Sequence, residues 1–275
     1  MAYSRAYVEI TNICNRNCSF CPGTVRDKRR MTMGEFQRIT EQLQGITEYI
    51  YLHVMGEPLT HPLLPDFIRC AGEKSFKVAI TTNGTLLRRC QEELLNARPY
   101  KVSISVHSFE EGTLESYLDY LTQCMEFADQ SSREGILTVL RLWNRGYDKG
   151  RNVDTLAILQ DFFREEWKEG SRGFRIRDKL HLEYGDRFVW PDMEALEGDD
   201  RVFCYGLKDH FGILCDGSVI PCCLDREGAI TLGNIYEQPI KEILVSERSV
   251  QIAEGFGRRR AVEELCRKCG YARRF

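Results

Sequence analysis

The stretch Ala6–Thr24, AYVEITNICNRNCSFCPGT, joins a predicted strand to a loop that carries three cysteines. The alternation of apolar and polar residues over Ala6–Ile10 indicates a half-buried strand. Cys14, Cys18 and Cys21 follow at the spacing C-x-x-x-C-x-x-C. Three thiolates on one tight loop can bind three corners of a [4Fe–4S] cubane, which normally takes four cysteines. Because no fourth cysteine is close by in the sequence, one iron would stay open to another ligand.

Strand and helix signals alternate about six times beyond this loop. Strands rich in Val, Ile, Leu and Tyr, separated by helical crossovers, favour a parallel sheet with helices outside it. Six units suit a partial (β/α)6 TIM-like barrel of the α/β class, with the chemistry at the carboxyl ends of the strands. The expected strands are Ala6–Ile10, Tyr49–Val54, Phe76–Thr81, Lys101–Val106, Leu137–Leu142 and Lys179–Tyr184. The expected helices are Met33–Leu43, His61–Ala71, Thr85–Leu95, Glu110–Asp129 and Val153–Trp167.

The composition is that of an ordinary globular chain, with a net charge of −3 and no basic field that would bind a nucleic-acid polymer. The longest apolar run, Tyr49–Met55, is far too short to cross a bilayer. The twelve cysteines, in a sequence without a visible secretory signal, indicate metal or redox chemistry rather than a disulfide framework. We therefore expect a cytoplasmic protein that has neither a membrane nor a nucleic-acid polymer as its partner.

The cysteine loop, its position after the first strand and the aromatic Phe20 before the third cysteine resemble the radical SAM superfamily. In that family the open iron of a [4Fe–4S] cluster chelates S-adenosylmethionine. An electron from the cluster then cleaves the sulfonium to a 5′-deoxyadenosyl radical, which abstracts hydrogen from the substrate. The resemblance implies a cluster on Cys14, Cys18 and Cys21, and an electron donor such as flavodoxin or ferredoxin. The alternative for this loop is a zinc knuckle, which needs four ligands, and the nearest histidine, His53, is distant in sequence.

Further features of this family occur at the ends of the predicted strands, so that the resemblance covers about residues 5–185. Met55-Gly56-Glu57-Pro58 resembles the G-G-E-P motif, with Met55 in place of the first glycine; in the family its backbone and its acid bind the cofactor's ammonium. Thr82-Asn83-Gly84 resembles the T-N-G motif, and three more polar residues occupy the ends of the next two strands. The cofactor-binding residues that the resemblance implies are Phe20, Gly56, Glu57, Pro58, Asn83, Ser105, Arg141 and Asn144.

The character of the sequence changes after Trp190, where the acidic stretch 193–200 indicates a linker. Asp216-Gly217 lies between two apolar runs of Gly212–Pro221, which predicts a hairpin, and a short helix is expected over Gln238–Ser246. We therefore predict two domains, a partial barrel over 1–190 and a small domain over 195–275.

A second group of cysteines lies in this small domain. The spacing of its cysteines and Gly217 resembles the C-terminal extension called SPASM, or its shorter form, Twitch. The four matching positions are enough for one closed auxiliary [4Fe–4S] cluster; they are Cys204, Cys222, Cys266 and Cys269. Zinc in the same four-cysteine site is the alternative. Whether Cys215 or Cys223 takes part stays open, although the glycine spacing favours Cys222.

The connector HLEYGDRFVWP, residues 181–191, is denser in aromatic and ionisable residues than a plain linker needs. Together with the barrel mouth it supplies the predicted substrate contacts, which are His107, His181, Glu183, Tyr184, Asp186, Arg187 and Trp190. The basic run Arg26–Arg30 is interpreted as a solvated face, with phosphate binding as the alternative. Cys70, Cys90 and Cys124 are expected to be buried free thiols in helices.

A small, polar substrate is favoured, because peptide-modifying relatives usually carry an additional leader-binding domain. Two types of short relative with one auxiliary cluster are candidates. The reactions of both types begin with hydrogen abstraction from a sugar-like ring carbon. The queuine lyase type, which frees a modified base from a nucleoside or nucleotide, is our first expectation. The alternatives are an aminocyclitol or sugar dehydrogenase that uses the auxiliary cluster as electron acceptor, a peptide-modifying maturase, and a non-enzymatic binding module stabilised by zinc or iron–sulfur.

Overall fold

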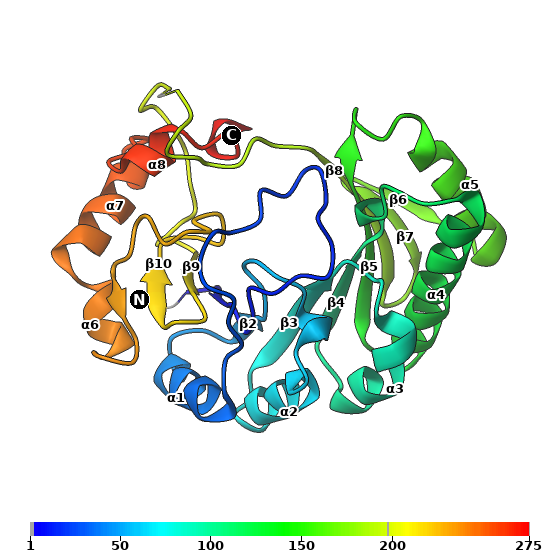
Figure 1. Cartoon of the computed structure of the whole chain (residues 1–275), viewed down its shortest axis with the longest axis horizontal. Helices are drawn as coiled ribbons and strands as arrows, with labels where there is room; N and C mark the ends of the chain where they lie inside the picture. The colour runs from blue at the N-terminus through cyan, green and yellow to red at the C-terminus, as the bar shows by residue number, and fades with distance from the viewer. Residues whose placement is uncertain (1–2, 197, 275) are drawn as a thin grey trace.

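The computed structural model describes residues 3–196 and 198–274, and in these residues an open, curved sheet is covered by helices on its outer face (Figure 1). The sheet has eleven strands in the order β11-β10-β9-β1-β2-β3-β4-β5-β8-β7-β6. Residue 197 of the predicted acidic linker, and residues 1, 2 and 275 at the predicted domain ends, lie outside the described residues. The α/β fold class and the partial, unclosed barrel are confirmed.

The six parallel strands of the predicted barrel are β1 to β5 and β8. Their bounds are β1 Arg5–Val8, β2 Tyr49–Tyr51, β3 Lys77–Thr82, β4 Lys101–Ser105, β5 Leu137–Arg145 and β8 Leu180–Asp186. The loop between β1 and α1, which carries the first three cysteines, crosses the mouth of the barrel in Figure 1.

Five helices cover the outer face of these strands. They are α1 Met33–Leu43, α2 Leu64–Glu73, α3 Leu87–Ala97, α4 Leu114–Arg133 and α5 Arg151–Phe162, with short 3-10 turns at η1 Pro58–Thr60 and η2 Val106–Ser108. The expected start of α4 at Glu110 was wrong, because Thr113 is the N-cap and its side chain accepts a hydrogen bond from the backbone N–H of Ser116. None of the helices in 3–196 and 198–274 is long and apolar enough to cross a membrane.

The expected end of α5 at Trp167 was also wrong. A hairpin that was not predicted, β6 Lys168–Gly170 and β7 Gly173–Arg177, follows the helix and pairs antiparallel with β8. Its turn uses Gly173 at φ +144°, where a side chain would meet the carbonyl of Leu182. Trp167 then packs on Phe174 of the hairpin instead of ending the helix, with 5.7 Å between ring centroids.

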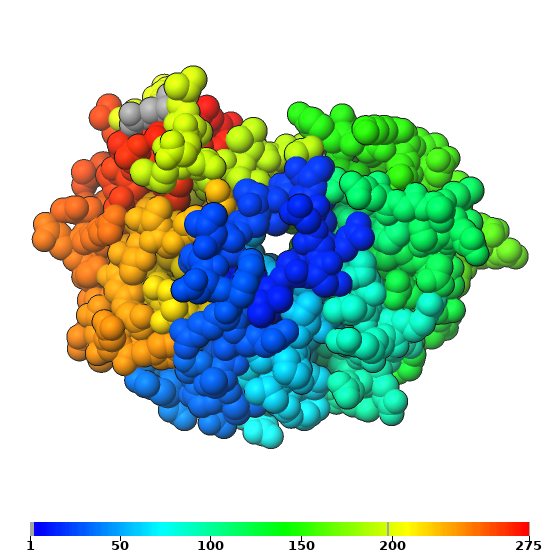
Figure 2. Space-filling view, viewed as in Figure 1, coloured from blue at the N-terminus to red at the C-terminus, as the bar shows by residue number. Residues whose placement is uncertain are grey.

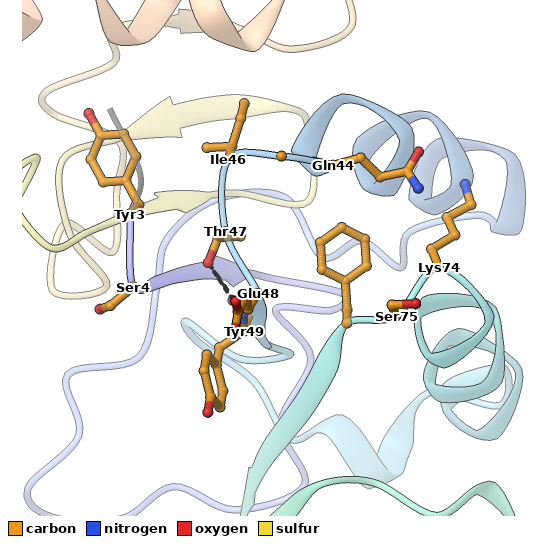
Figure 3. A pocket seen from close by; sticks show the side chains of 11 residues that line it. Tyr3, Ser4, Gln44, Ile46, Thr47, Glu48, Tyr49, Lys74 and Ser75 are labelled. Atoms are coloured by element: carbon orange, nitrogen blue, oxygen red, sulfur yellow. Dashed lines mark hydrogen bonds between the residues drawn. The ribbon is translucent and has the colours of Figure 1, made fainter.

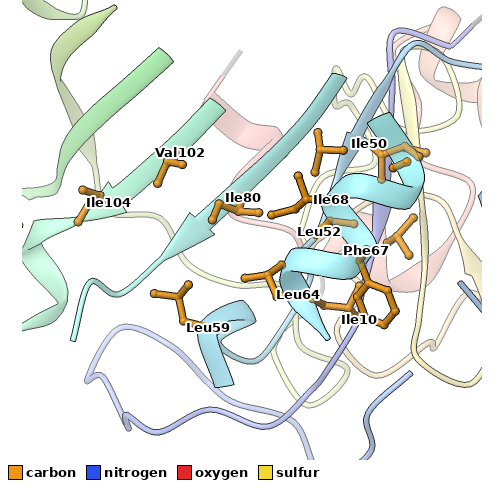
Figure 4. Close-up of a cluster of buried hydrophobic side chains, with 14 of the residues drawn as sticks. Ile10, Ile50, Leu52, Leu59, Leu64, Phe67, Ile68, Ile80, Val102 and Ile104 are labelled. Atoms are coloured by element: carbon orange, nitrogen blue, oxygen red, sulfur yellow. The ribbon is translucent and has the colours of Figure 1, made fainter. Parts of the chain in front are cut away.

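Alternation along the parallel strands divides their side chains between two environments. One set faces the helices: Ile50, Ile80 and Val102 lie against Leu64 and Phe67 of α2 in one hydrophobic core (Figure 4). The other set faces the barrel lumen and is strongly polar; it includes Arg5, Tyr7, Tyr51, Thr81, Lys101, Ser103, Ser105, Arg141, His181 and Glu183. The lumen is therefore lined for polar contacts while the outer face holds the fold together.

The C-terminal region extends the barrel sheet. β9 His210–Ile213 pairs parallel with β1, and β10 Ser218–Ile220 returns antiparallel to β9 through Asp216-Gly217, which confirms the predicted hairpin. The remaining elements are β11 Gly233–Asn234, α6 Ile240–Leu244, α7 Glu247–Gly257, α8 Glu264–Arg267 and η3 Ala272–Arg274. The sheet thus continues across the predicted boundary near residue 195, and the domain limits 1–190 and 195–275 stay a prediction.

A cavity of about 500 Å³ opens at the amino ends of the strands. Tyr3, Ile46, Thr47, Tyr49 and Phe76 are among the residues that line it (Figure 3). The hydroxyl of Thr47 donates to the carbonyl of Tyr49 at 3.2 Å, so this polar group is already satisfied. The cavity is at the opposite end of the strands from the cysteine loop, and we do not assign it to the active site.

Candidate active site

The three N-terminal cysteines lie on the loop directly after β1, where Cys14 is exposed and Cys18 and Cys21 are half-buried. The backbone N–H of Cys21 donates to the carbonyl of Cys18 at 3.0 Å, and that of Arg16 donates to Sγ of Cys14 at 3.4 Å. Burial raises the pKa of the Cys18 thiol to about 12, and Glu110 and the other two thiols add to this rise. Among the described residues, no three such ligands lie close enough together to hold a single metal ion.

Contacts from distant segments fix the tip of this loop. The N–H and hydroxyl of Ser19 donate to the two carboxylate oxygens of Glu110, both at 2.5 Å. Arg187 donates to the carbonyl of Ser19 at 3.1 Å, and the indole N–H of Trp190 donates to the carbonyl of Phe20 at 3.0 Å. Trp190 and Arg187, which we expected to contact substrate, therefore hold the cysteine loop in place.

The carboxylate of Glu57 is buried and binds backbone amides. Its two oxygens accept from the N–H of Leu59 at 3.0 Å and from the N–H of Asn83 at 2.6 Å. Burial raises the pKa of Glu57 to about 7, although these amide hydrogen bonds act in the opposite direction. Glu57 thus joins the G-E-P turn to the T-N-G turn, and its binding to the cofactor's ammonium stays a prediction.

Asn83 extends the site from β3 toward the cysteine loop. Its amide Nδ2 donates to Oδ1 of Asn15 at 2.9 Å and lies 4.0 Å from Sγ of Cys14. Its backbone carbonyl accepts hydrogen bonds from Ser108 and Tyr120 at 3.1 and 2.8 Å. The predicted residues Glu57 and Asn83 are thus brought together with a cluster cysteine.

Gly56 lies where two chain segments approach closely. It has φ +77°, and a Cβ there would lie 2.4 Å from the carbonyl oxygen of Thr11 in the cysteine loop. The N–H of Glu57 also donates to the carbonyl of Ile13 at 2.9 Å. The turn and the loop are therefore packed directly against each other, and only a glycine at position 56 permits this close approach.

We expect Gly56→Ala to separate this turn from the cysteine loop and to weaken S-adenosylmethionine binding roughly tenfold or more. The matched control is Gly45→Ala, because Gly45 has φ +74° but nothing within 4 Å of its missing Cβ. Both variants carry the same backbone strain, of order 1–3 kcal/mol. The difference between their losses of stability and cofactor affinity therefore measures the effect of the close approach between the turn and the cysteine loop. Denaturant unfolding and cofactor binding are measured for both variants under anaerobic conditions. Equal losses of stability and of cofactor affinity in the two variants would contradict the prediction.

A cavity of about 740 Å³ opens beside the loop, between the carboxyl ends of β4 and β5. This volume is typical of small-molecule sites, about 300–1,000 Å³. Phe20, His107 and Asn144, all predicted site residues, line it. Phe20 and His107 have ring centroids 5.0 Å apart, and Asn144 accepts a hydrogen bond from Asn152 at 3.0 Å. Burial lowers the pKa of His107 to about 4.

The other predicted site residues separate into two groups. Ser105, Arg141 and Glu183 lie side by side on β4, β5 and β8, and all three face the lumen, as does His181. Tyr184, whose contact with substrate stays a prediction, lies apart from this group. It is one residue further along β8, so it points to the outer face, where it packs 6.3 Å from Phe174.

The four C-terminal cysteines predicted to bind the second cluster are neighbours in the structure. Burial raises the pKa of the Cys222 thiol, and Cys204, Cys223, Cys266 and Cys269 raise it further. The pKa of Cys266 is likewise raised by burial and then by Cys204 and Cys269. The four thiols are therefore near enough to influence one another, and their binding of a single cluster stays a prediction.

The two remaining cysteines of this region point elsewhere. The thiol of Cys215 donates to the carbonyl of Glu9 at 3.0 Å. Burial raises the pKa of Cys223 to about 11, while a hydrogen bond with Tyr7, a lumen residue, acts against that rise. Cys223 is also influenced by Cys204, so the choice of Cys222 as the ligand stays a prediction from the glycine spacing.

Glu9 was missed by the sequence reasoning, although its carboxylate joins three segments of the site. It is fully buried and accepts from Arg26 of the cysteine loop at 2.6 Å and from the N–H of Met55 at 3.2 Å. Its second oxygen accepts from the N–H of Cys215 at 3.2 Å. Arg26 is therefore no part of a solvated face, since it also donates to the carbonyl of Arg226 at 2.8 Å.

Comparison with protein-family models now identifies the class. The Radical SAM superfamily model matches residues 8–167, and SPASM, an iron–sulfur cluster-binding domain, matches residues 204–270. The first match covers more than half of the chain, and the chain belongs to the radical SAM superfamily. It is an enzyme that uses S-adenosylmethionine and a [4Fe–4S] cluster, and its SPASM region carries an auxiliary iron–sulfur cluster.

Among curated relatives, the chain is 25% identical over 240 residues to the GTP 3′,8-cyclase of Chlorobaculum tepidum. This match covers 78% of this chain and 69% of the relative. A shorter match, 34% identical over 85 residues, is to the tungsten-containing aldehyde ferredoxin oxidoreductase cofactor-modifying protein of Pyrococcus furiosus and covers 30% of this chain and 24% of the relative.

Two solved structures share the fold over nearly the whole chain. BtrN in complex with AdoMet and 2-DOIA has a TM-score of 0.63 at 19% identity, covering 98% of this chain and 93% of its own. Streptococcus suis SuiB bound to S-adenosylmethionine also has a TM-score of 0.63, at 16% identity, covering 98% of this chain and 71% of its own. At these identities the likeness shows the fold alone.

Proposed function

We propose that this enzyme abstracts a hydrogen atom from a sugar-like ring of a small, polar substrate that enters the barrel lumen. A modified nucleoside or nucleotide is the substrate we favour, with release of the base as in the queuine lyase type. The observation that carries the proposal is the polar lumen directly below the cysteine loop, in which Arg141, Glu183 and His181 face inward. An apolar substrate would leave these groups without partners, which is costly in a buried site.

The residues present fit the cofactor that the family uses. Cys14, Cys18 and Cys21 would hold the cluster, and the backbone around Gly56 would receive the ammonium of S-adenosylmethionine. When bound and reduced, the cluster supplies the electron that splits the cofactor into methionine and a 5′-deoxyadenosyl radical, which takes hydrogen from the substrate. Phe20 and Asn144 line the 740 Å³ cavity beside the loop, where we place the adenosine part.

The chain's own residues position and shield this chemistry. Trp190 and Glu110 fix the loop tip through the contacts at 3.0 and 2.5 Å described above. Trp143 at the end of β5 lies over Arg141, with 4.4 Å from the guanidinium carbon to the ring centroid, and it also lines the 740 Å³ cavity. Positioning of this kind contributes strongly to rate, because a small displacement of reacting groups costs much of it.

Dehydrogenation is the second candidate, and the place of Cys223 favours it. Cys223 adjoins the predicted ligand Cys222 and contacts the lumen residue Tyr7, so the auxiliary cluster would lie next to the substrate. In that reaction the substrate would lose a hydrogen atom and then a proton and one electron, and a cluster held by Cys204, Cys222, Cys266 and Cys269 would supply the acceptor for that electron. The product is oxidised by two electrons.

Anaerobic incubation with reductant, S-adenosylmethionine and a queuine-type nucleoside or its 5′-monophosphate tests the proposal. We expect 5′-deoxyadenosine to form only when substrate is present, together with free base. A sugar ketone in place of free base would instead support dehydrogenation. Formation of 5′-deoxyadenosine at the same rate without substrate would exclude both.

A further inference from the structure

The barrel lumen contains more positive than negative charge. Lys101 and Arg141 face inward from β4 and β5, and Glu183 is the carboxylate that faces them from β8. A third cation, Arg5, is already paired with Asp209 at 2.8 Å. Lys101 and Arg141 are both half-buried, so two lumen cations face one carboxylate where an unbalanced charge is costly.

Arg141 has donors that no described residue uses. Its Nη1 donates to the hydroxyl of Thr81 at 3.3 Å, and within residues 3–196 and 198–274 its buried Nε has no hydrogen-bond partner. The same is true of Nδ1 of His53, whose Nε2 lies 3.4 Å from the Thr81 hydroxyl. Buried polar groups in folded proteins nearly always have partners, so these two indicate a missing ligand.

The charged groups around these donors make this part of the lumen favourable for an anion. Burial lowers the pKa of Lys101, and the charge of Arg141 lowers it further, while Glu183 opposes the change. The pKa of His53 is lowered to about 3, first by burial and then by Arg141 and Lys101. His53 is therefore neutral at pH 7 and adds no charge of its own, which leaves Arg141 and Lys101 as the cationic wall.

The lumen also holds a group of aromatic rings on or next to β1, β2 and β9, and it has an opening. Tyr7 lies 5.2 Å from Tyr51, 5.5 Å from His53 and 5.5 Å from His210, measured between ring centroids. In the space-filling view an opening is visible in the middle of the molecule, bounded by the cysteine loop (Figure 2). A small molecule could thus enter under the loop and meet the rings and the cations together.

We propose that Arg141 and Lys101 bind an oxyanion of the substrate, a phosphate or a carboxylate group. This inference rests on the proposed function and narrows it: the substrate is an anionic molecule, such as a nucleotide, rather than a neutral nucleoside or a cationic aminocyclitol. The guanidinium offers parallel donors that match phosphate and carboxylate oxygens, and the ammonium adds a second charge. Arg141 is thereby reassigned from the cofactor, where the family resemblance placed it, to the substrate.

The test uses the full chain with both clusters, titrated calorimetrically with inorganic phosphate and, separately, with acetate at fixed ionic strength. We expect Arg141→Gln to weaken binding of at least one of these anions about tenfold or more. The matched control is Arg145→Gln on the same strand, because Arg145 is exposed, with 61% of its side chain accessible. Lys101→Gln is the second variant and should also weaken anion binding. The anion that binds more tightly tells whether phosphate or carboxylate is the group recognised.

S-adenosylmethionine affinity is measured on the same variants. The proposal predicts that it is unchanged in Arg141→Gln, whereas a loss of cofactor binding would overturn the proposal by returning Arg141 to the cofactor. Equal anion binding by wild type and both lumen variants, or no anion binding at all, would overturn it too. If anion binding depends on Arg141 but neither nucleoside nor nucleotide promotes 5′-deoxyadenosine formation, the proposed function fails while the anion site stands.

Discussion

Replacing Cys14, Cys18 and Cys21 together by alanine is expected to abolish reductive cleavage of S-adenosylmethionine and to lower the iron content from about eight to about four per chain. The three thiols are the ligands that leave one iron open to the cofactor, so no other group in the site can take over their role. The auxiliary cluster should survive, because its four predicted cysteines lie in the SPASM region, residues 204–270. Iron analysis and chromatography of the products measure the two effects.

The control is the double variant Cys70→Ala with Cys90→Ala. Both cysteines lie in helices, α2 and α3, as the sequence predicts, but they are half-buried and not buried as expected; neither is near the cysteine loop in the chain. We expect this variant to keep about eight irons and full cofactor cleavage. Cleavage by the triple variant, or loss of all iron from it, would contradict our assignment of two separate clusters.

Glu9→Gln is expected to lower the free energy of unfolding by about 3 kcal/mol, because it leaves the Arg26 guanidinium in a buried site without its carboxylate. Glu9 has no exposed side-chain surface, and the side chain of Arg26 is only 16% exposed. The substitution also loosens three segments at once, since the same carboxylate binds the amides of Met55 and Cys215. We therefore expect cofactor cleavage to fall together with stability.

Glu254→Gln is the control for this variant. It breaks an ion pair of the i,i+4 type with Arg258, in which the two side chains are 57% and 76% exposed. Such a surface pair contributes at most about 0.5 kcal/mol. Anaerobic denaturant titrations compare the two variants. A loss in Glu9→Gln no larger than in the control would show that the Glu9 carboxylate does not hold these segments together.

The sequence predicted the parallel strands well because in each strand the alternate residues that face the helices are strongly apolar. Val102 and Ile104 in β4, and Leu140 and Leu142 in β5, are of this kind. Elements with weaker patterns were missed. The β6–β7 hairpin has charged, exposed residues such as Lys168 and so lacks an apolar signal. Its turn is marked only by Gly170 and Gly173.

Within the site, motif spacing placed the cysteines, Gly56 and Asn83, but it could not show which neighbours their side chains would meet. Glu57 carries a charge in a recognised motif, yet its oxygens bind backbone amides that only the folded chain brings near. Glu9 has no partner close by in sequence; Arg26 and Cys215 reach it from 17 and 206 residues away. The alternation of β8 would have placed Tyr184 on the opposite face once Glu183 was taken to face the lumen.

Transfer of deuterium is the most direct measurement of the central claim, that the radical acts on a sugar-like ring carbon of a small substrate in the lumen. A queuine-type nucleoside 5′-monophosphate, deuterated on its ribose, is incubated anaerobically with enzyme, reductant and S-adenosylmethionine. Our account predicts that the 5′-deoxyadenosine formed gains deuterium from the ribose and that its amount depends on the substrate. Unlabelled 5′-deoxyadenosine, formed equally with and without the nucleotide, would contradict it.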